Sequence, residues 1–444
     1  MNNISPLSLN KKTQRENYIL VGSMIYIAGQ GSAWAISDWY LVLCFLYALF
    51  VYFKRFNRSD KVFLYLTLGY IVLTTLYFAK FGWINYSSSF RFYLKLAYAY
   101  LVIKSIDHVF FEIYENYFYY LCLIALILYP FQLLFYDQLK VLLSVFENVL
   151  PNWDYTRTTD GGSGYATNAI FFTLHDDALD RNSGYAWEPK GFATLILVAI
   201  ISNLIRNKMK MANKAMLVYV LALLTTLSTA GYVVFFVAIL LFYAFNTNKQ
   251  YVLALVPVIV VLIPIVAQLD FVTQKIITEF ETRNDSEDII RYYQKENFEK
   301  GTVISLGRFP SFLLDMEDLK REPLLGFGMQ DKERTEGKNA YFARVNGLSD
   351  LMARWGILGS ILYLIILFKG IKKWIYRHDY KGHTIIFVAF LGLFFASAVI
   401  LQPLWLIFPM YGLIASKTKS APIPHFKKSS QNNGYPEREL TYVQ

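Results

Sequence analysis

The residues best suited to chemistry are the arginines of a long hydrophilic stretch, residues 269–347, which carries 12 basic and 15 acidic residues. A guanidinium is planar, always charged and matches phosphate oxygens with two parallel hydrogen bonds, so such arginines suit a phosphate-bearing ligand. The alternative is that they pair with the acids of the same stretch. Both interpretations stay open for this set: Arg283, Arg291, Arg308, Arg321, Arg334 and Arg344. Arg308 has the most defined context, because it lies in Gly307-Arg308-Phe309-Pro310, ahead of an amphipathic stretch.

Two charged pairs have helical spacing. Arg91 and Lys95 are four residues apart and share one helix face, where they either extend to lipid headgroups or turn inward to hold anionic oxygens. Asp350 and Arg354 have the same spacing, so they are expected to form an ion pair or to position a substrate.

Glu188 precedes Pro189 at the end of a second hydrophilic stretch, residues 136–188. An acid followed by proline is typical of a helix start, which alone explains the pair. The alternative is a partly desolvated carboxylate with a raised pKa that acts as general base toward a hydroxyl. His175-Asp176-Asp177 has metal-ligand residue types but no second histidine nearby, so no metal site and no cofactor are expected. No nucleotide-binding motif is present either.

The elements that position these residues are predicted to be membrane-spanning helices. The 444 residues are 55% hydrophobic, 18% aromatic and only 17% charged, which does not fit a soluble surface. Apolar runs of the length that a bilayer requires recur along the chain. The sequence predicts an all-α polytopic membrane protein with about twelve transmembrane helices and two large outer loops that contain short helices. The expected spans are 18–36, 39–53, 61–79, 90–106, 117–135, 189–205, 215–229, 230–246, 251–268, 348–368, 384–401 and 403–416.

Basic residues set the predicted orientation, because short cytoplasmic loops collect lysine and arginine. With twelve spans both termini lie inside and the basic clusters near residues 54–61, 206–214, 369–381 and 417–428 all face the cytoplasm. The net charge of +10 is thereby explained without nucleic acid. Spans then fill 1–135, 189–268 and 348–416, separated by outer loops at 136–188 and 269–347 and followed by a cytoplasmic tail, 417–444. The count depends on splitting 215–246 near Ser228 to Gly231 and 384–416 at Gln402 and Pro403.

Several motifs occur in an order that resembles the O-antigen polymerase (Wzy) family. RNSGYAWEPKGFA at 181–193 leads into a span, LSTAG follows at 227–231, and PLLGFG at 323–328 follows Gly307-Arg308. NGLSD at 346–350 then precedes WGILG at 355–359. The family's outer loops carry an Arg followed by Gly at a fixed interval, commonly with ten residues between. The nearest fits are Arg181 to Gly191 and Arg291 to Gly301, each with nine between.

The resemblance implies an inverting, metal-independent glycosyltransferase of the bacterial inner membrane, with its active site on the periplasmic face. A growing glycan would move from undecaprenyl pyrophosphate to the non-reducing end of a lipid-linked repeat unit. The implied partners are these oligosaccharide lipids, membrane lipids and a chain-length regulator. The expected roles are catalysis for Glu188, Arg181 and Arg308, and pyrophosphate binding for Arg91, Lys95, Arg308 and Arg291. Substrate positioning is expected for Asn346, Asp350 and Arg354.

Two alternative functions are a ligase and a transporter. The related O-antigen ligases usually carry a His-Asn pair where this chain reads Arg344-Val345-Asn346, so the missing histidine favours a polymerase. A flippase for lipid-linked sugars is typically built from internal repeats with midplane charges, whereas here the polar residues concentrate in outer loops.

Overall fold

The computed structural model describes residues 11–56, 60–146, 155–156, 163–164, 166–175, 180–247, 304–305, 308–334 and 342–414. The expected span at 251–268, the residues Arg291, Asp176 and Asp177, and most of the tail lie outside these residues.

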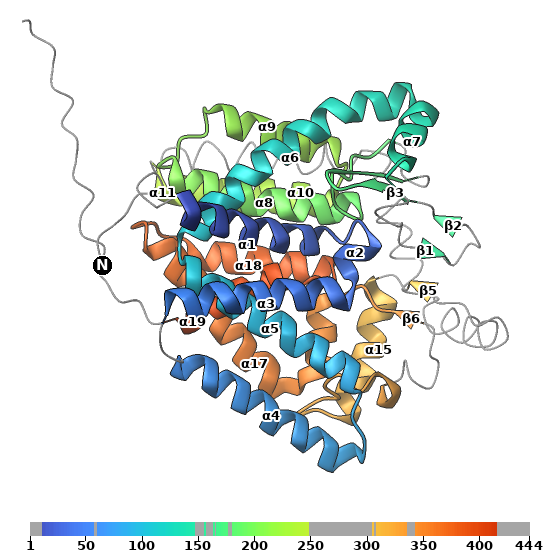
Figure 1. The fold of residues 1–444 in the computed structure, drawn as a ribbon, viewed down its shortest axis with the longest axis vertical. Helices are drawn as coiled ribbons and strands as arrows, with labels where there is room; N and C mark the ends of the chain where they lie inside the picture. The colour runs from blue at the N-terminus through green and yellow to red at the C-terminus, as the bar shows by residue number, and fades with distance from the viewer. Residues whose placement is uncertain are drawn as a thin grey trace, which may run out of the picture.

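The described chain is mostly helical, with a few short strands at one end of the helices (Figure 1). The first helices are α1 (Lys11–Gly29), α2 (Ala33–Ile36), α3 (Asp38–Arg55), α4 (Lys61–Phe81), α5 (Tyr86–Ile106), α6 (Val109–Leu134) and α7 (Tyr136–Ser144). The central ones are α8 (Pro189–Arg206), α9 (Lys214–Thr225), α10 (Thr229–Val233), the π-helix η2 (Val234–Ile239) and α11 (Leu240–Asn246). The last are α15 (Arg308–Arg321), the 3-10 turn η3 (Asp331–Glu333), α17 (Gly347–Tyr376), α18 (His383–Ala396) and α19 (Pro403–Leu413).

The strands form three two-stranded sheets. β1 (Tyr155–Thr156) pairs antiparallel with β2 (Ser163–Gly164), and β3 (Ala166–Ala169) pairs antiparallel with β4 (Phe172–His175). β5 (Ile304–Ser305) pairs in parallel with β6 (Phe342–Ala343), so two segments of the second loop lie side by side. The expected loops therefore contain short strands as well as short helices.

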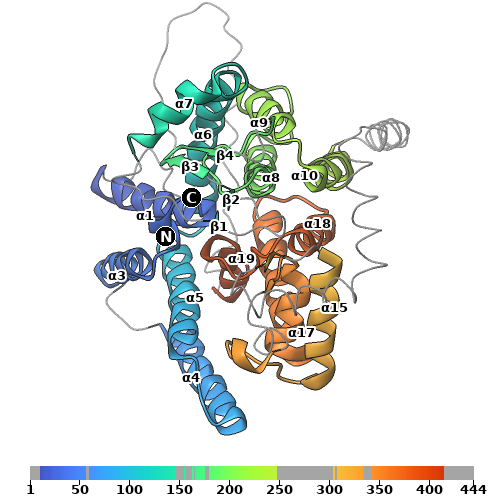
Figure 2. The same cartoon turned by 90° about the vertical axis from the view of Figure 1, so that its right-hand side faces the viewer.

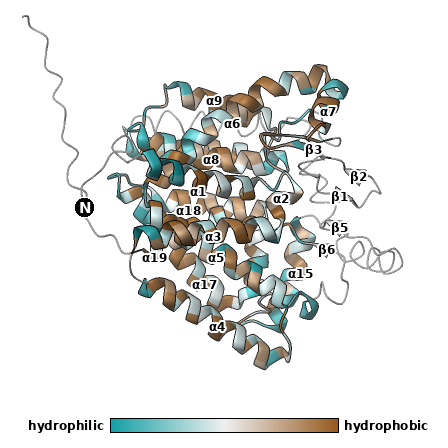
Figure 3. Ribbon diagram, viewed as in Figure 1, coloured by the Kyte–Doolittle hydropathy of each residue, from teal (hydrophilic) through white to brown (hydrophobic). Residues whose placement is uncertain are grey.

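Five described helical segments are long and apolar enough to cross a membrane: Lys61–Phe81, Val109–Leu134, Pro189–Arg206, Thr229–Asn246 and Gly347–Tyr376. Three shorter helices, α9, α18 and α19, are also apolar. Hydrophobic residues dominate the middle of the helices and hydrophilic ones gather toward their ends (Figure 3). The prediction of a helical membrane protein is confirmed, but five such segments are fewer than the twelve expected spans.

Both expected helix breaks are present. α9 ends at Thr225 and α10 begins at Thr229, after Leu227 with a φ of 46° and with the Ser228 hydroxyl accepting from the Gly231 amide at 3.3 Å. α18 ends at Ala396, and α19 begins at Pro403, a residue that the first turn of a helix tolerates.

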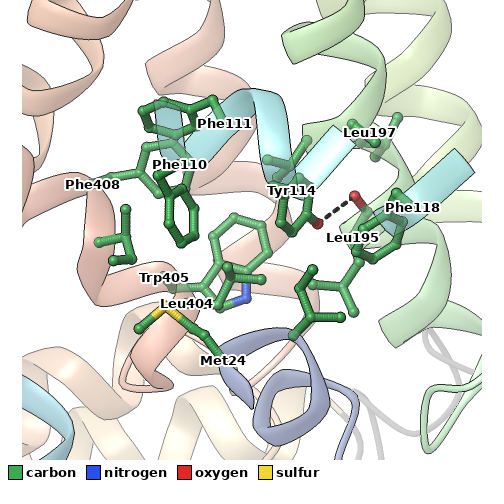
Figure 4. Close-up of a cluster of buried hydrophobic side chains, with 14 of the residues drawn as sticks. Met24, Phe110, Phe111, Tyr114, Phe118, Leu195, Leu197, Leu404, Trp405 and Phe408 are labelled. Carbon is green, nitrogen blue, oxygen red and sulfur yellow. Dashed lines mark hydrogen bonds between the residues drawn. The ribbon is translucent and has the colours of Figure 1, made fainter. Parts of the chain in front are cut away.

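The core is aromatic and centres on α6 and α19 (Figure 4). Phe111 of α6 stacks on Trp374 with ring centres 4.4 Å apart, and the buried Tyr114 hydroxyl donates to the Leu195 carbonyl at 2.8 Å. Small residues let α17 and α19 approach closely, since a Cβ at Gly370 would lie 1.8 Å from the Phe408 carbonyl oxygen. In the view of Figure 2, α4 and α5 extend together from one side of the bundle while α15 and α17 lie beside each other on the other.

Candidate functional site

Arg91 and Lys95 of α5 lie at the centre of the candidate site. Both line two cavities, of about 290 Å³ and about 380 Å³, which also share Gln402 from the segment between α18 and α19. We call these two cavities together the cationic hollow. Arg344 and Arg354 add two further cations to its lining. Arg91 and Lys95 share one helix face, as their spacing predicts, and both line the hollow.

The start of α5 sets the direction of both cations. Asn85 caps the helix by accepting from the Ser88 amide at 3.2 Å, and the four-residue spacing then places Arg91 and Lys95 on the same side. Arg91 forms an ion pair with Asp38, whereas Lys95 makes neither a hydrogen bond nor an ion pair with a described residue. Lys95 therefore brings a cation to the hollow with no carboxylate bonded to it.

On the opposite wall of the hollow, Asp350 and Arg354 form the expected ion pair, with 2.9 Å between Oδ2 and Nε. Arg354 also donates through Nη1 to Asp331 Oδ1 at 2.7 Å. Asp350 accepts from Arg334 at 2.7 Å as well, so it is shared between two guanidinium groups. An ion pair and a role in positioning a substrate are therefore compatible for Asp350 and Arg354, because the ion-paired Arg354 still lines the cavity.

Behind this wall lies a buried charge network made of Asp315, Asp318, Arg334, Arg344 and Asp350. The Arg334 side chain is fully buried and contacts Asp315 at 2.8 Å and Asp318 at 3.1 Å. Arg344 contacts the same two carboxylates at 2.5 Å and 2.7 Å. Burial and the nearby Asp350 raise the pKa of Asp315 to about 6 against the opposing effect of Arg344 and Arg334. For Arg334 and Arg344, pairing with the acids of the loop is the interpretation that holds.

A break in α17 joins the two motifs PLLGFG and WGILG into one structure. Gly356 has a φ of 60°, and the helix hydrogen bonds lost around it are replaced by the segment 323–328. The amides of Phe327 and Gly328 donate to the carbonyls of Ala353 and Arg354 at 3.1 Å and 2.6 Å. In return the Ile357 amide donates to the Pro323 carbonyl at 2.8 Å. Since unpaired backbone groups are costly away from water, this exchange lets the helix bend beside Arg354.

Glycines make this contact between loop and helix possible. A Cβ at Gly356 would lie 2.3 Å from the Leu324 oxygen, and one at Gly326 would lie 2.6 Å from the Ala353 oxygen. Gly326 also has a φ of 67°, which side chains disfavour. The sequence indicated the two motifs separately, and only the fold relates them.

A second group forms around Glu188, at the start of α8. Lys190 Nζ lies 3.3 Å from Glu188 Oε1, and Arg181 and Arg308 are close enough to act on the same carboxyl. Burial raises the pKa of Glu188, but these three cations outweigh it and the pKa lies below its ordinary value. Of the two alternatives for Glu188, the raised pKa does not hold. The other alternative, a helix start, holds: α8 begins at Pro189 with Glu188 at its N-cap, although the Glu188 side chain does not bond the helix amides.

The two arginines of this second group are held by backbone carbonyls. Arg181 Nε donates to the Thr226 carbonyl at 3.3 Å, between α9 and α10, and burial lowers the pKa of this guanidinium against the opposing charge of Glu188. Arg308 Nε donates to the Ala396 carbonyl at 3.4 Å, at the end of α18. The segment from Ser397 to Gln402 follows directly, so it connects this group to the wall of the cationic hollow.

The remaining predicted residue is Asn346, which is fully buried as the cap of α17 and accepts from the Ser349 amide at 3.1 Å. It positions the helix that carries Asp350 and Arg354 and is not one of the residues that line the hollow. Sequence reasoning missed Asp331, Asp315 and Asp318, because only the folded loop brings these acids to the arginines. Within the described ranges no three His, Cys, Asp or Glu side chains come together as ligands for a metal.

Comparisons of the chain with family models, with curated proteins and with solved structures give no match. What fold and site define together is a helical membrane protein with a cation-lined hollow.

Proposed function

We propose that this chain is a polymerase of a surface polysaccharide of the O-antigen type. It transfers a growing glycan from undecaprenyl pyrophosphate to the non-reducing end of a lipid-linked repeat unit and releases undecaprenyl pyrophosphate. The proposal includes twelve spans in the bacterial inner membrane, both termini in the cytoplasm and the cationic hollow on the periplasmic face. It is supported by the succession of motifs and by the chemistry of the hollow.

The observation that carries the proposal is the meeting of Arg91 and Lys95 with Arg344 and Arg354 in the lining of one cavity. A pyrophosphate leaving group gains negative charge as its bond to the sugar breaks. Cations that are already in place stabilise that charge strongly where water is largely excluded. Lys95, with no carboxylate bonded to it among the described residues, is the cation best placed to take a phosphate oxygen.

A polymerase of this type binds two lipid pyrophosphates, one on the donor and one on the acceptor. The second group offers Arg181, Lys190 and Arg308 as cations for the acceptor lipid, with the 397–402 segment between the two sites. Several sugars separate the acceptor's reactive hydroxyl from its own pyrophosphate, so two separate cation groups suit this reaction. Glu188, ionised among these cations, orients them and the acceptor.

The test is polymer length in a strain of the source bacterium that lacks this protein and carries variants of it. We expect Arg91→Ala and Lys95→Ala each to reduce polymer formation about 10²-fold or more, the loss typical of one preorganised donor. Arg91→Lys keeps the charge but not the bidentate geometry, so it should restore polymerisation only in part. The readout is the ladder of chain lengths on a gel.

The matched control is Lys80→Ala. Lys80 lies at the same end of the helices and pairs with Glu322, but it does not line the hollow. Its variant should give a normal ladder at normal membrane abundance. Normal ladders from both Arg91→Ala and Lys95→Ala would contradict the proposed site.

The same strain separates the alternative functions. Loss of a polymerase leaves single repeat units on lipid at the outer face. Repeat units trapped inside would indicate a transporter, and long chains that are not attached to the lipid A core would indicate a ligase.

A further inference from the structure

One carboxylate of the cationic hollow has no role in the function proposed above. Asp331 lines the 290 Å³ cavity together with Arg91, Lys95 and Arg354. Its side chain is 39% exposed, and Oδ1 accepts from Arg354 Nη1 at 2.7 Å. Oδ2 has no hydrogen bond to any residue that the structure describes, so it is open to a ligand.

Two residues that flank Asp331, at the two ends of the turn η3, hold it in place. The preceding residue, Gln330, is 1% exposed and accepts from the Asn85 amide at 2.8 Å. Two residues further on, Glu333 accepts from Trp83 Nε1 at 2.7 Å. Both anchors attach the turn to the connection between α4 and α5. Asp331 is thus fixed relative to the helix that carries Arg91 and Lys95, unlike an ordinary exposed loop acid.

The other carboxylates around the hollow are less suited to accept a proton. Asp350 is 14% exposed and is shared between Arg334 and Arg354. Asp38 lines the adjoining 380 Å³ cavity and pairs with Arg91, the cation that faces the pyrophosphate in the proposed reaction. Glu188 belongs to the second group, where Lys190 holds it.

We propose that Asp331 is the general base of the transfer, an inference that rests on the polymerase function proposed above. Its Oδ2 takes the proton from the acceptor hydroxyl while the acceptor oxygen bonds to C1 of the donor sugar. The bond from C1 to the phosphate oxygen breaks, and its electron pair leaves with undecaprenyl pyrophosphate, whose charge Arg91 and Lys95 stabilise. The proton passes from Asp331 to water after the product leaves. Arg354 orients the carboxylate between turnovers.

The experiment uses the full-length protein in liposomes, with lipid-linked repeat units extracted from the strain that lacks it. Asp331→Asn should lower kcat about 10²–10⁴-fold, the contribution typical of a positioned base, with KM and the binding of added undecaprenyl pyrophosphate unchanged. The fall of kcat toward acid pH should disappear in this variant. Asp331→Glu keeps the base at a changed distance and should recover part of the rate.

The matched control is Glu322→Gln, a carboxylate of the same segment that pairs with Lys80 outside the hollow and should leave the rate unchanged. Normal turnover by Asp331→Asn beside an active wild type would overturn the role of Asp331 and leave the polymerase proposal standing. Loss of undecaprenyl pyrophosphate binding in that variant would mean that Asp331 only holds Arg354, which also overturns the inference. A large loss of kcat in Asp38→Asn with none in Asp331→Asn would assign the base to Asp38. A wild type that forms no polymer would remove the proposed function and the inference together.

Discussion

The two ends of the helices use charge in opposite ways. At the end away from the hollow, carboxylates pair with cations. None of these pairs lines either cavity of the hollow. Asp107 accepts from Arg377 at 3.0 Å, and the buried Glu115 accepts from Arg206 at 2.7 Å. Asp60 accepts from the Tyr100 hydroxyl at 2.9 Å and pairs with Lys104. At the hollow end the carboxylates are also paired, yet four cations still line an open space: Arg91, Lys95, Arg344 and Arg354.

The difference teaches that positive charge at a helix end does not by itself mark a site. The basic residues of the far end that enter the protein, Arg206 and Arg377 among them, are neutralised by carboxylates. At the hollow end a full network of buried pairs lies behind the cations and fixes them. Arg334 is the clearest case, since its whole guanidinium is used inside the protein and none of it reaches the cavity.

The largest expected effect therefore comes from Arg334→Met. The substitution leaves Asp315, Asp318 and Asp350 without one of their cations in a buried site, where removing one partner costs about 3–5 kcal/mol. We expect a much lower thermal midpoint in detergent and a reduced yield of folded protein.

The variant to compare with Arg334→Met is Arg377→Met at the far end. Arg377 pairs with Asp107, whose side chain is 43% exposed. A partly solvated pair contributes about 1 kcal/mol or less, so this variant should stay folded with a midpoint near that of the wild type. Equal losses in the two variants would break the distinction between the buried network at the hollow end and the partly solvated Asp107–Arg377 pair at the other end.

The next largest effect is expected from a change in the segment 323–328 contact, whose backbone hydrogen bonds replace those that α17 loses around Gly356. Gly356→Ala forces a side chain onto a φ of 60° and against the Leu324 oxygen, which we expect to cost about 2–4 kcal/mol from backbone strain and overpacking. Because the same contact positions Arg354 and the segment before Asp331, polymer formation should fall even in the fraction that folds.

Gly392→Ala is the matched control, since nothing lies within 4 Å of a Cβ at that position in α18. Alanine inside a helix is favoured over glycine by about 0.5–1 kcal/mol, so this variant should be at least as stable as the wild type. A Gly356→Ala protein with wild-type stability and polymer length would mean that the bend beside Arg354 is not needed.

The helical framework could be predicted from the sequence because each helix depends on local apolar runs and local breaks. Ser228 and Pro403 mark helix starts by their own chemistry, and the spacing of Arg91 and Lys95 determines that they share a face. The number of helices long and apolar enough to span a membrane was predicted less well. The count rested on apolar runs and on the placement of basic clusters, and several of the described helices, such as α9, α18 and α19, are short.

The wall of the hollow could not be predicted, because its contacts join residues far apart in the chain. Asp315 and Arg334 are separated by an irregular segment whose path no local pattern specifies. The Phe327 and Gly328 amides replace helix hydrogen bonds of α17, so PLLGFG and WGILG function together only in the folded protein. Asp331 gains its position from Asn85 and Trp83, which lie some 250 residues earlier in the sequence.

The smallest expected effects concern pH, and their signs should be opposite at the two ends. At the far end, burial raises the pKa of Asp107, but His108 and Arg377 outweigh it and lower the pKa to about 2 from an ordinary value of 3.8. Ionised Asp107 therefore contributes stability that is present above about pH 4 and is lost as pH falls through 2. Since the side chain is 43% exposed, Asp107→Asn should cost about 1 kcal/mol at pH 7 and less at pH 3.

At the hollow end, burial and Asp350 raise the pKa of Asp315 to about 6 from 3.8. Its neutral form contributes stability that is present below about pH 4 and is lost as pH rises through 6. Asp315→Asn keeps the neutral state at every pH, so its thermal midpoint relative to wild type should rise between pH 4 and pH 7. The midpoint of Asp107→Asn relative to wild type should fall between about pH 2 and pH 4 and stay level above pH 4. Thermal midpoints of both variants from about pH 2 to pH 7 measure the two slopes. The same sign in both would mean that Asp315 in the buried network is as well compensated by its cations as Asp107 is by Arg377, and that burial does not distinguish these two carboxylates.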